Sequence, residues 1–133
     1  MGVIPSIQRT AHVIGRHLES ALADVGVDQG EARVLSALAA GPRTVASLVE
    51  AVGVKRSTLT NILDRLETRG LARREINPAD RRSFVVRPTR AGERAARKVA
   101  RKFDAVDVQL ARTTTTRERQ AFEAVLAKLE ELM

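Results

Sequence analysis

The sequence predicts a mainly α-helical protein with one small β-hairpin, an α+β arrangement, in a single domain spanning its 133 residues. Most of the chain repeats apolar residues at spacings of three and four, the period of an amphipathic helix. Only residues 71–88 are strand-like, and turn-forming residues divide that region in two. Hydrophobic residues make up 44% of the chain and aromatic residues only 2%, so we expect a packed aliphatic core.

Capping residues mark the first two helices. Residues 4–23 repeat apolar side chains along one face, and Gly26 ends that segment. A second helix follows Asp28, which can form a capping box with Glu31. The Gly-Pro pair at 41–42 then stops the second helix.

Two short helices follow with a tight turn between them. Thr44 is a good N-cap for the third helix, and Gly53 supplies its C-terminal stop. Residues 56–70, "RSTLTNILDRLETRG", form the fourth helix, which ends at Gly70. Two helices joined by a short glycine-containing turn are the helix-turn-helix pattern.

A β-hairpin and two further helices complete the chain. Strands are expected at 71–76 and 83–88, with a loop at 77–82 between them. Thr89 can cap a fifth helix, and Thr115 begins the final amphipathic one. A helix-turn-helix followed directly by a hairpin, or wing, gives a winged helix-turn-helix.

The fourth helix has an unusual outward face. Its aliphatic residues cluster on one side, and short hydrogen-bonding side chains project from the other. Such groups can approach base edges or phosphates closely, unlike the Glu/Lys mixture of an ordinary exposed helix. The candidate DNA contacts here are Lys55, Arg56, Ser57, Thr58, Thr60, Asn61 and Arg65.

Charge is concentrated around this helix. The chain carries a formal net charge of +7. Residues 55–102 hold 15 Lys and Arg against 5 Asp and Glu, a balance of +10, whereas the remainder holds 8 against 11. A concentrated positive field indicates a polyanion partner, although a solvated basic surface would look the same.

The hairpin loop adds two more candidate contacts, Arg81 and Arg82. A wing beside a recognition helix reaches the adjacent minor groove, whose negative potential suits arginine. Asp80 is placed to orient one of these guanidinium groups through a charge-assisted pair.

These motifs together resemble the MarR family of winged helix-turn-helix transcriptional regulators. The segments that carry the resemblance are "LTNILDRLETRGLARR", "DRR" and "TRAG" within residues 30–92. The resemblance implies a homodimer whose recognition helices enter major grooves while the wings enter minor grooves. It assigns residues 28–88 to a DNA-binding lobe, and 4–25 and 89–133 to dimerisation helices.

Two positions depart from the family pattern. Lys55 stands where a small capping hydroxyl is common, which leaves the start of the recognition helix open. Pro88 removes a strand donor and should end the second strand early.

The resulting hypothesis is a dimeric, sequence-specific, DNA-binding transcriptional regulator, more a repressor than an activator. A two-fold dimer predicts a palindromic operator. Relatives often release DNA on binding a small molecule, so an effector is possible, but the sequence names none. The alternative is a winged-helix module that docks on protein without reading DNA.

Other classes find little support. No paired carboxylates, phosphate loop or activated nucleophile indicates an enzyme, and no cofactor is expected. Without cysteine, thiolate metal sites and thiol redox sensing are excluded. His12 and His17 are five residues apart and do not share a helix face as a metal pair would. No transmembrane segment or secretory signal is evident, so we expect a cytoplasmic protein.

Overall fold

A computed structural model describes residues 2–133 and divides the chain into two compact units. The first unit ends at Lys102, and the second is Phe103–Met133. The first unit contains α1 (Val3–Leu22), α2 (Gln29–Leu38), β1 (Arg43–Thr44), α3 (Val45–Val52), α4 (Arg56–Thr68), β2 (Ala72–Asn77) and β3 (Asp80–Pro88). The helix α5 (Arg90–Thr113) begins there and continues into the second unit, which also contains α6 (Thr116–Leu132).

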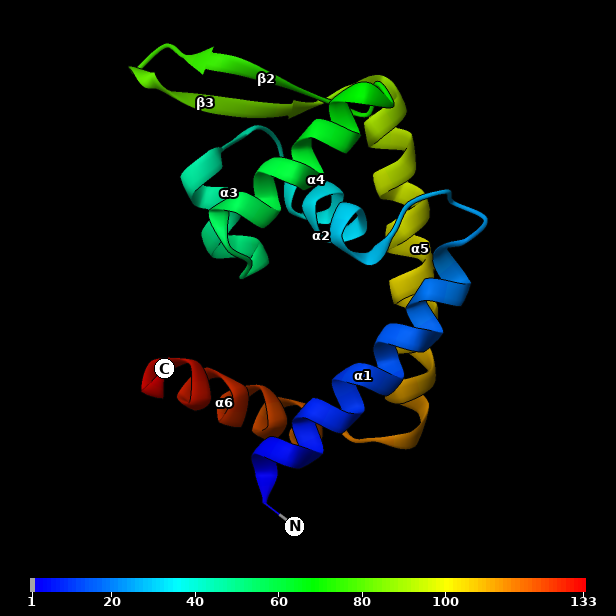
Figure 1. Cartoon of the computed structure of the whole chain (residues 1–133). Coiled ribbons are helices and arrows are strands. Elements are labelled where there is room, and N and C mark those ends of the chain that lie inside the picture. The colour runs from blue at the N-terminus through cyan, green and yellow to red at the C-terminus, as the bar shows by residue number, and fades with distance from the viewer. Residues whose placement is uncertain (1) are drawn as a thin grey trace. The chain divides into compact units, whose positions relative to one another are not determined.

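The predicted class is confirmed: the structure is mainly helical with one small antiparallel sheet (Figure 1). The helix boundaries lie close to the predicted ones because the predicted caps are present. Asp28 and Glu31 form the capping box of α2, and Thr115 with Glu118 forms that of α6. Hydrogen bonds from the backbone and hydroxyl of Thr115 lower the pKa of Glu118.

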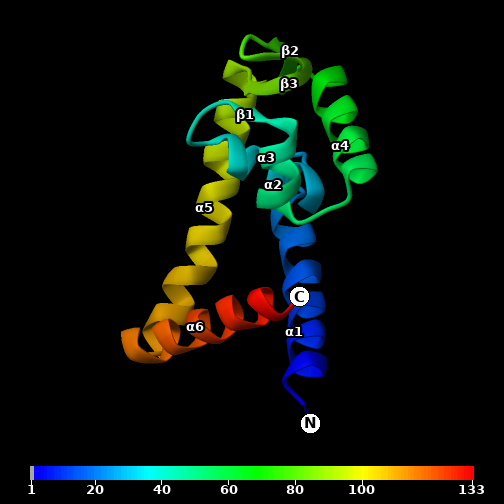
Figure 2. The ribbon, with the colours of Figure 1, turned by 90° about the vertical axis from the view of Figure 1, so that its left-hand side faces the viewer.

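The core of the first unit is aliphatic, as expected. It lies between α2, α3, α4 and the first half of α5, and Figure 2 shows α4 and α5 on opposite sides of α2 and α3. The largest fully buried side chains are Leu22, Leu35, Leu38, Leu48, Leu59, Leu63, Leu66, Val34, Val86 and Val99.

The sheet has one strand that we did not predict. Its order is β1-β3-β2, so β3 is central, and Arg43 and Thr44 pair with Val86 and Val85. Two residues are too few to show the alternation that marks a strand in a sequence.

The hairpin is longer and its turn tighter than predicted. Asp80, Arg81 and Arg82, which we expected in the loop, belong to β3, so the connection is only residues 78–79. The strand pairing shifts between Ile76 and Asn77, and this bulge accommodates the extra β3 residues.

Side chains of the turn stabilise the tip of the hairpin. The Asn77 side chain accepts a hydrogen bond from the Ala79 backbone N–H and donates one to the Ser83 hydroxyl, both at 3.1 Å. These local bonds replace the regular ladder where the strands shift in register.

The expectation that Pro88 would shorten the second strand was wrong. β3 includes Pro88, which pairs with Ala72. Because Pro88 is the last residue of the strand and β1 reaches only as far as Val86, the missing N–H interrupts little of the ladder.

The junction between β3 and α5 explains the "TRAG" motif. The Thr89 hydroxyl donates to the Gly70 carbonyl at 2.6 Å and accepts from the Gly92 backbone N–H at 3.1 Å. A Cβ on Gly92 would lie 1.9 Å from the carbonyl oxygen of Leu71. Glycine is therefore required for the first turn of α5 to approach the connection between α4 and β2.

Candidate nucleic-acid interface

The helix α4 presents the outward face that its sequence predicts. Leu59, Ile62, Leu63 and Leu66 are buried, and the predicted contact residues on the other face are all exposed. Within residues 2–133, the side chains of Ser57, Thr58 and Asn61 have no protein hydrogen-bond partner. Their donors and acceptors are therefore free for a ligand.

Thr60 differs from its neighbours on this face. Its hydroxyl donates to the Arg56 carbonyl at 3.0 Å, within the same helix. Since the single hydroxyl proton is used, Thr60 retains only acceptor capacity for an outside group.

The start of α4 carries positive charge and free backbone donors. Lys55 occupies the N-cap position but its side chain makes no capping hydrogen bond. Lys55 and Arg56 are exposed, and neither forms an ion pair with the residues that the structure describes. A helix N-terminus with flanking cations and uncapped N–H groups favours an anion such as phosphate.

Arg65 is partnered within the protein. Its guanidinium lies 3.2 Å from a carboxylate oxygen of Asp28, the N-cap of α2. Both side chains are about half exposed. A phosphate at this position would have to share the Arg65 guanidinium with Asp28, or displace Asp28 as its partner.

A second arginine, Arg69, holds the end of α4 on the same N-terminus of α2. It donates to the Glu31 carboxylate at 2.7 Å and to the Gly26 carbonyl. Glu31 is only 4% exposed and also accepts from the Asp28 backbone N–H at 3.1 Å. One carboxylate therefore caps α2 and positions α4.

Arg74 connects the wing to α4. Its guanidinium pairs with both Asp64 and Glu67, one turn apart on the helix. Partial burial tends to lower the pKa of Arg74, but the hydrogen bonds and charges of the two carboxylates outweigh it and raise the pKa. The wing is thus fixed to α4 by a charged, partly buried contact.

The tip of the wing presents two exposed arginines. The Asp80 carboxylate accepts from the Arg82 backbone N–H at 3.1 Å and from its side-chain Nε at 3.4 Å. The Arg82 side chain is nevertheless 93% exposed. Arg81 is also exposed and has no ion-pair partner among the described residues.

Sequence reasoning missed the positioning contacts of this surface. Asp64 and Arg65 are adjacent exposed residues of α4, yet each pairs with a different element. Opposite charges far apart in sequence were the available signal, but a sequence cannot show which of 23 cations meets which of 16 acids.

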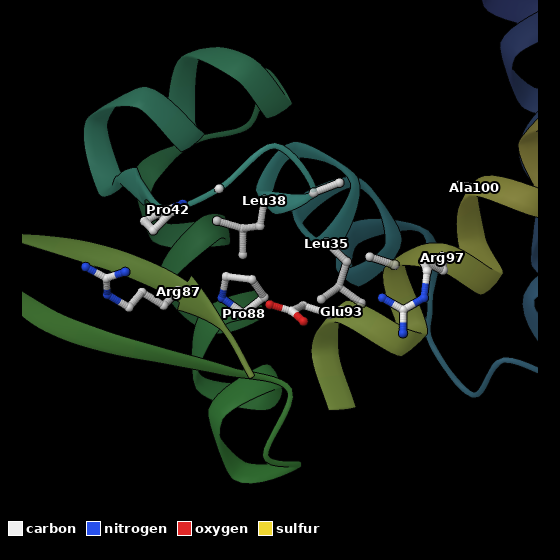
Figure 3. A pocket seen from close by; sticks show the side chains of 11 residues that line it. Leu35, Leu38, Pro42, Arg87, Pro88, Glu93, Arg97 and Ala100 are labelled. Atoms are coloured by element: carbon white, nitrogen blue, oxygen red, sulfur yellow. The ribbon is translucent and has the colours of Figure 1, made fainter. Parts of the chain in front are cut away.

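A pocket of about 350 Å³ lies on the other side of the first unit, between α2, the end of β3 and the first half of α5 (Figure 3). Leu35, Leu38 and Pro88 contribute apolar walls. Arg87 and Arg97 lie at its two ends, with Glu93 between them. A cavity of this size is suited to a small molecule with an apolar body.

Neither a metal centre nor a membrane span was found in the part of the chain that the structure describes. No group of His, Cys, Asp or Glu there could hold a metal ion. No helix there is both long and apolar enough to cross a bilayer.

Comparison with known proteins identifies the class. The MarR family model matches residues 25–83. The crystal structure of a MarR-family transcriptional regulator from Silicibacter pomeroyi is 30% identical, covers 96% of this chain and 88% of its own, and superposes with a TM-score of 0.81. The chain therefore belongs to the MarR family, a family of transcription regulators and not of enzymes.

Two other proteins are similar to this chain. The S. aureus MepR–DNA complex is 20% identical, with a TM-score of 0.89 over 100% of this chain and 99% of that one, and shows the shared fold. The HTH-type transcriptional regulator YcgE of Bacillus subtilis (strain 168) is 30% identical over 94 residues, 71% of this chain. The match spans 61% of YcgE, about three fifths of its length.

Proposed function

We propose that this protein is a dimeric, sequence-specific DNA-binding transcriptional regulator that acts as a repressor in the cytoplasm. One observation carries the proposal: the unpartnered Ser57, Thr58 and Asn61 of α4 lie in the same compact unit as the arginine-bearing wing. The MarR relatives, among them a MepR structure solved with DNA, support it.

The geometry supports contacts with two neighbouring grooves, one made by α4 and the other by the wing. The exposed face of α4 suits a major groove, where Asn61 can pair bidentately with adenine. Arg81 and Arg82 suit the neighbouring minor groove, especially where A·T pairs narrow it. Lys55, Arg56 and Arg65 lie where backbone phosphates would pass.

Free apolar surface supports the dimer. On α1, Val13 and Ile14 are about half exposed, and no residue of α6 is buried. Phe122 and Val125 of α6 are 58% and 46% exposed. Large apolar side chains left uncovered on two helices indicate an interface, and a two-fold dimer would read a palindromic operator.

The proposal includes relief of repression by a small-molecule effector, with the pocket between Arg87 and Arg97 as its candidate site. Arg97 is exposed and forms no ion pair among the described residues, so it favours an anionic ligand with an apolar body, whereas Arg87 already pairs with Glu75 at 2.8 Å. Thermal-shift screening of small carboxylates would test this idea. The idea would be contradicted by a compound that stabilises the protein without releasing it from DNA and that binds the Arg97→Ala variant as tightly as the wild type.

Selection of bound sequences from random duplex DNA tests the main proposal. We expect a palindrome with half-site centres about 10–10.5 base pairs apart, or a multiple of that spacing. If a dimer neutralises about ten phosphates, log affinity should fall against log salt with a slope of roughly −9. Recovery of no preferred sequence would refute sequence-specific regulation.

Two substitutions separate base reading from charge. Asn61→Ala should lose about 1–3 kcal/mol of discrimination at one base pair and leave the others unchanged. Arg82→Ala should weaken binding and reduce the preference for A·T pairs under the wing. Arg94→Ala is the matched control, because it removes an exposed charge that lies outside α4 and the wing and forms no ion pair among the described residues.

A further inference from the structure

The wing carries an exposed apolar pair that the proposed function does not use. Ile76 of β2 and Phe84 of β3 are direct cross-strand partners. They are 61% and 47% exposed, and they are the only large hydrophobic residues exposed between residues 29 and 88. Uncovered apolar side chains on an otherwise polar surface indicate a contact that the isolated chain does not make.

The pair lies on the side of the wing that faces α4. Side chains alternate along a strand, so Ile76 shares a face with Arg74, and Phe84 shares it with Val86. Arg74 reaches the carboxylates of α4 and Val86 is buried, so this face is the underside of the wing. Figure 1 shows the hairpin continuing past α3 and α4, beyond the part that the helices cover.

We propose that Ile76 and Phe84 form an apolar contact with duplex DNA, packing on the deoxyribose rings at the entrance to the minor groove. This inference rests on the proposed function. If α4 occupies a major groove and the wing the next minor groove, one sugar-phosphate strand must pass between them. The underside of the wing faces that strand, and sugars are its apolar part.

The surrounding charge favours DNA over a second copy of the wing. Exposed arginines, Arg81 and Arg82, flank the pair at the tip. Two wings packed face to face would bring four of these cations together and repel each other. A strand that offers phosphates beside its sugars satisfies both the arginines and the apolar pair.

The chain allows a direct optical test because it contains neither Trp nor Tyr. In the full-length Phe84→Trp variant, the only indole would lie at the proposed contact. We expect its emission to change as the selected duplex is added, with the same midpoint as binding measured by anisotropy of labelled DNA. Ser36→Trp, at an exposed position of α2 outside α4 and the wing, is the matched control and should give no change with DNA.

A loss-of-contact variant gives an independent readout. Ile76→Ser combined with Phe84→Ser should weaken affinity roughly tenfold, because apolar area is lost. The salt slope should stay unchanged because no charge is removed. Arg82→Ala should instead make the slope shallower by about 1.

The outcomes distinguish this contact from the function on which it rests. If the wild type binds its selected duplex but the indole emission of the Phe84→Trp variant stays constant, the proposed apolar contact is overturned and the proposed function stands. An unchanged affinity in the double serine variant has the same meaning. Emission that depends on protein concentration without DNA would assign the pair to a second copy of the chain. Failure of the wild type to retain any duplex overturns both proposals.

Discussion

The Glu31 carboxylate offers a sharp test of how α4 is positioned. It is the only charged residue that is buried within residues 2–133. It accepts the Asp28 backbone N–H at 3.1 Å and the Arg69 guanidinium at 2.7 Å. Glu31→Ala removes both bonds at once, and we expect it to destabilise the fold and to loosen α4 from α2.

The magnitude follows from the two lost contacts. Loss of the bond from the Asp28 backbone N–H to the Glu31 carboxylate, one half of the capping box, costs about 0.5–2 kcal/mol, while the Asp28 side-chain cap remains. A hydrogen bond between charged groups contributes about 1.5–3 kcal/mol, but the Arg69 side chain is 41% exposed, so we discount its share to about 1 kcal/mol. Glu31→Ala should therefore lower the free energy of unfolding by about 1.5–3 kcal/mol. With an unfolding entropy of about 2.1 cal/mol/K per residue, Tm should fall by roughly 5–11 °C.

Urea and thermal unfolding, followed by circular dichroism at one fixed protein concentration, would measure the effect. Glu31→Gln keeps an oxygen that can accept from Asp28 but loses the charged pair, so about half of the loss should remain. Arg33→Ala, on the exposed side of the same helix, is the matched control. A change below about 0.5 kcal/mol for Glu31→Ala would refute the reasoning.

Three further substitutions test the neighbouring contacts. Gly92→Ala should destabilise the fold despite a gain of about 1 kcal/mol in helix propensity, because its Cβ would meet the Leu71 carbonyl; a rise in Tm would contradict this. Arg74→Ala should lower the free energy of unfolding by about 1 kcal/mol and weaken DNA binding, measured by urea titration and anisotropy; full affinity would show that the wing needs no anchor. Asp28→Asn keeps a good N-cap but frees Arg65, so DNA affinity should rise and the salt slope should steepen by about 1; weaker binding at unchanged stability would contradict it.

The helices were predictable because their signals are local. Caps such as Asp28 and Thr44 accept hydrogen bonds from backbone amides three residues away, and both of these predicted bonds are present in the structure. The outward face of α4 also followed from periodicity alone. Most of residues 57–61 lie off the buried apolar face of the helix, so their exposure could be predicted without knowing any distant partner.

The errors lie where pairing between distant segments decides the structure. β1 is a strand only because Val85 and Val86 lie beside it. Asp80 joins β3 because a bulge after Ile76 lets the strand continue to the turn. A register shift of this kind depends on side-chain bonds such as that of Asn77 to Ser83, which no periodicity records.

Pairing also changes how the positive charge should be interpreted. Of the 15 cations in residues 55–102, six form ion pairs in the structure: Arg65, Arg69, Arg74, Arg82, Arg87 and Lys102. Several of these hold elements together. Lys102, for example, donates to Asp24 at 2.9 Å, and this hydrogen bond lowers the pKa of the carboxyl. A balance of +10 therefore overstates the charge that is free to meet phosphate.

The arrangement of these pairs suggests why the surface can act as one rigid unit. Glu31 and Asp28 hold α4 on α2, and Arg74 holds the wing on α4. The free groups, Asn61 on the helix and Arg81 on the wing, are then carried on elements whose mutual position is fixed before DNA arrives. A rigid surface loses less conformational entropy on binding than a mobile one, so more of the contact energy is available for affinity. We therefore expect acids such as Asp28, Glu31 and Asp64 to favour DNA binding by fixing where the free cations lie.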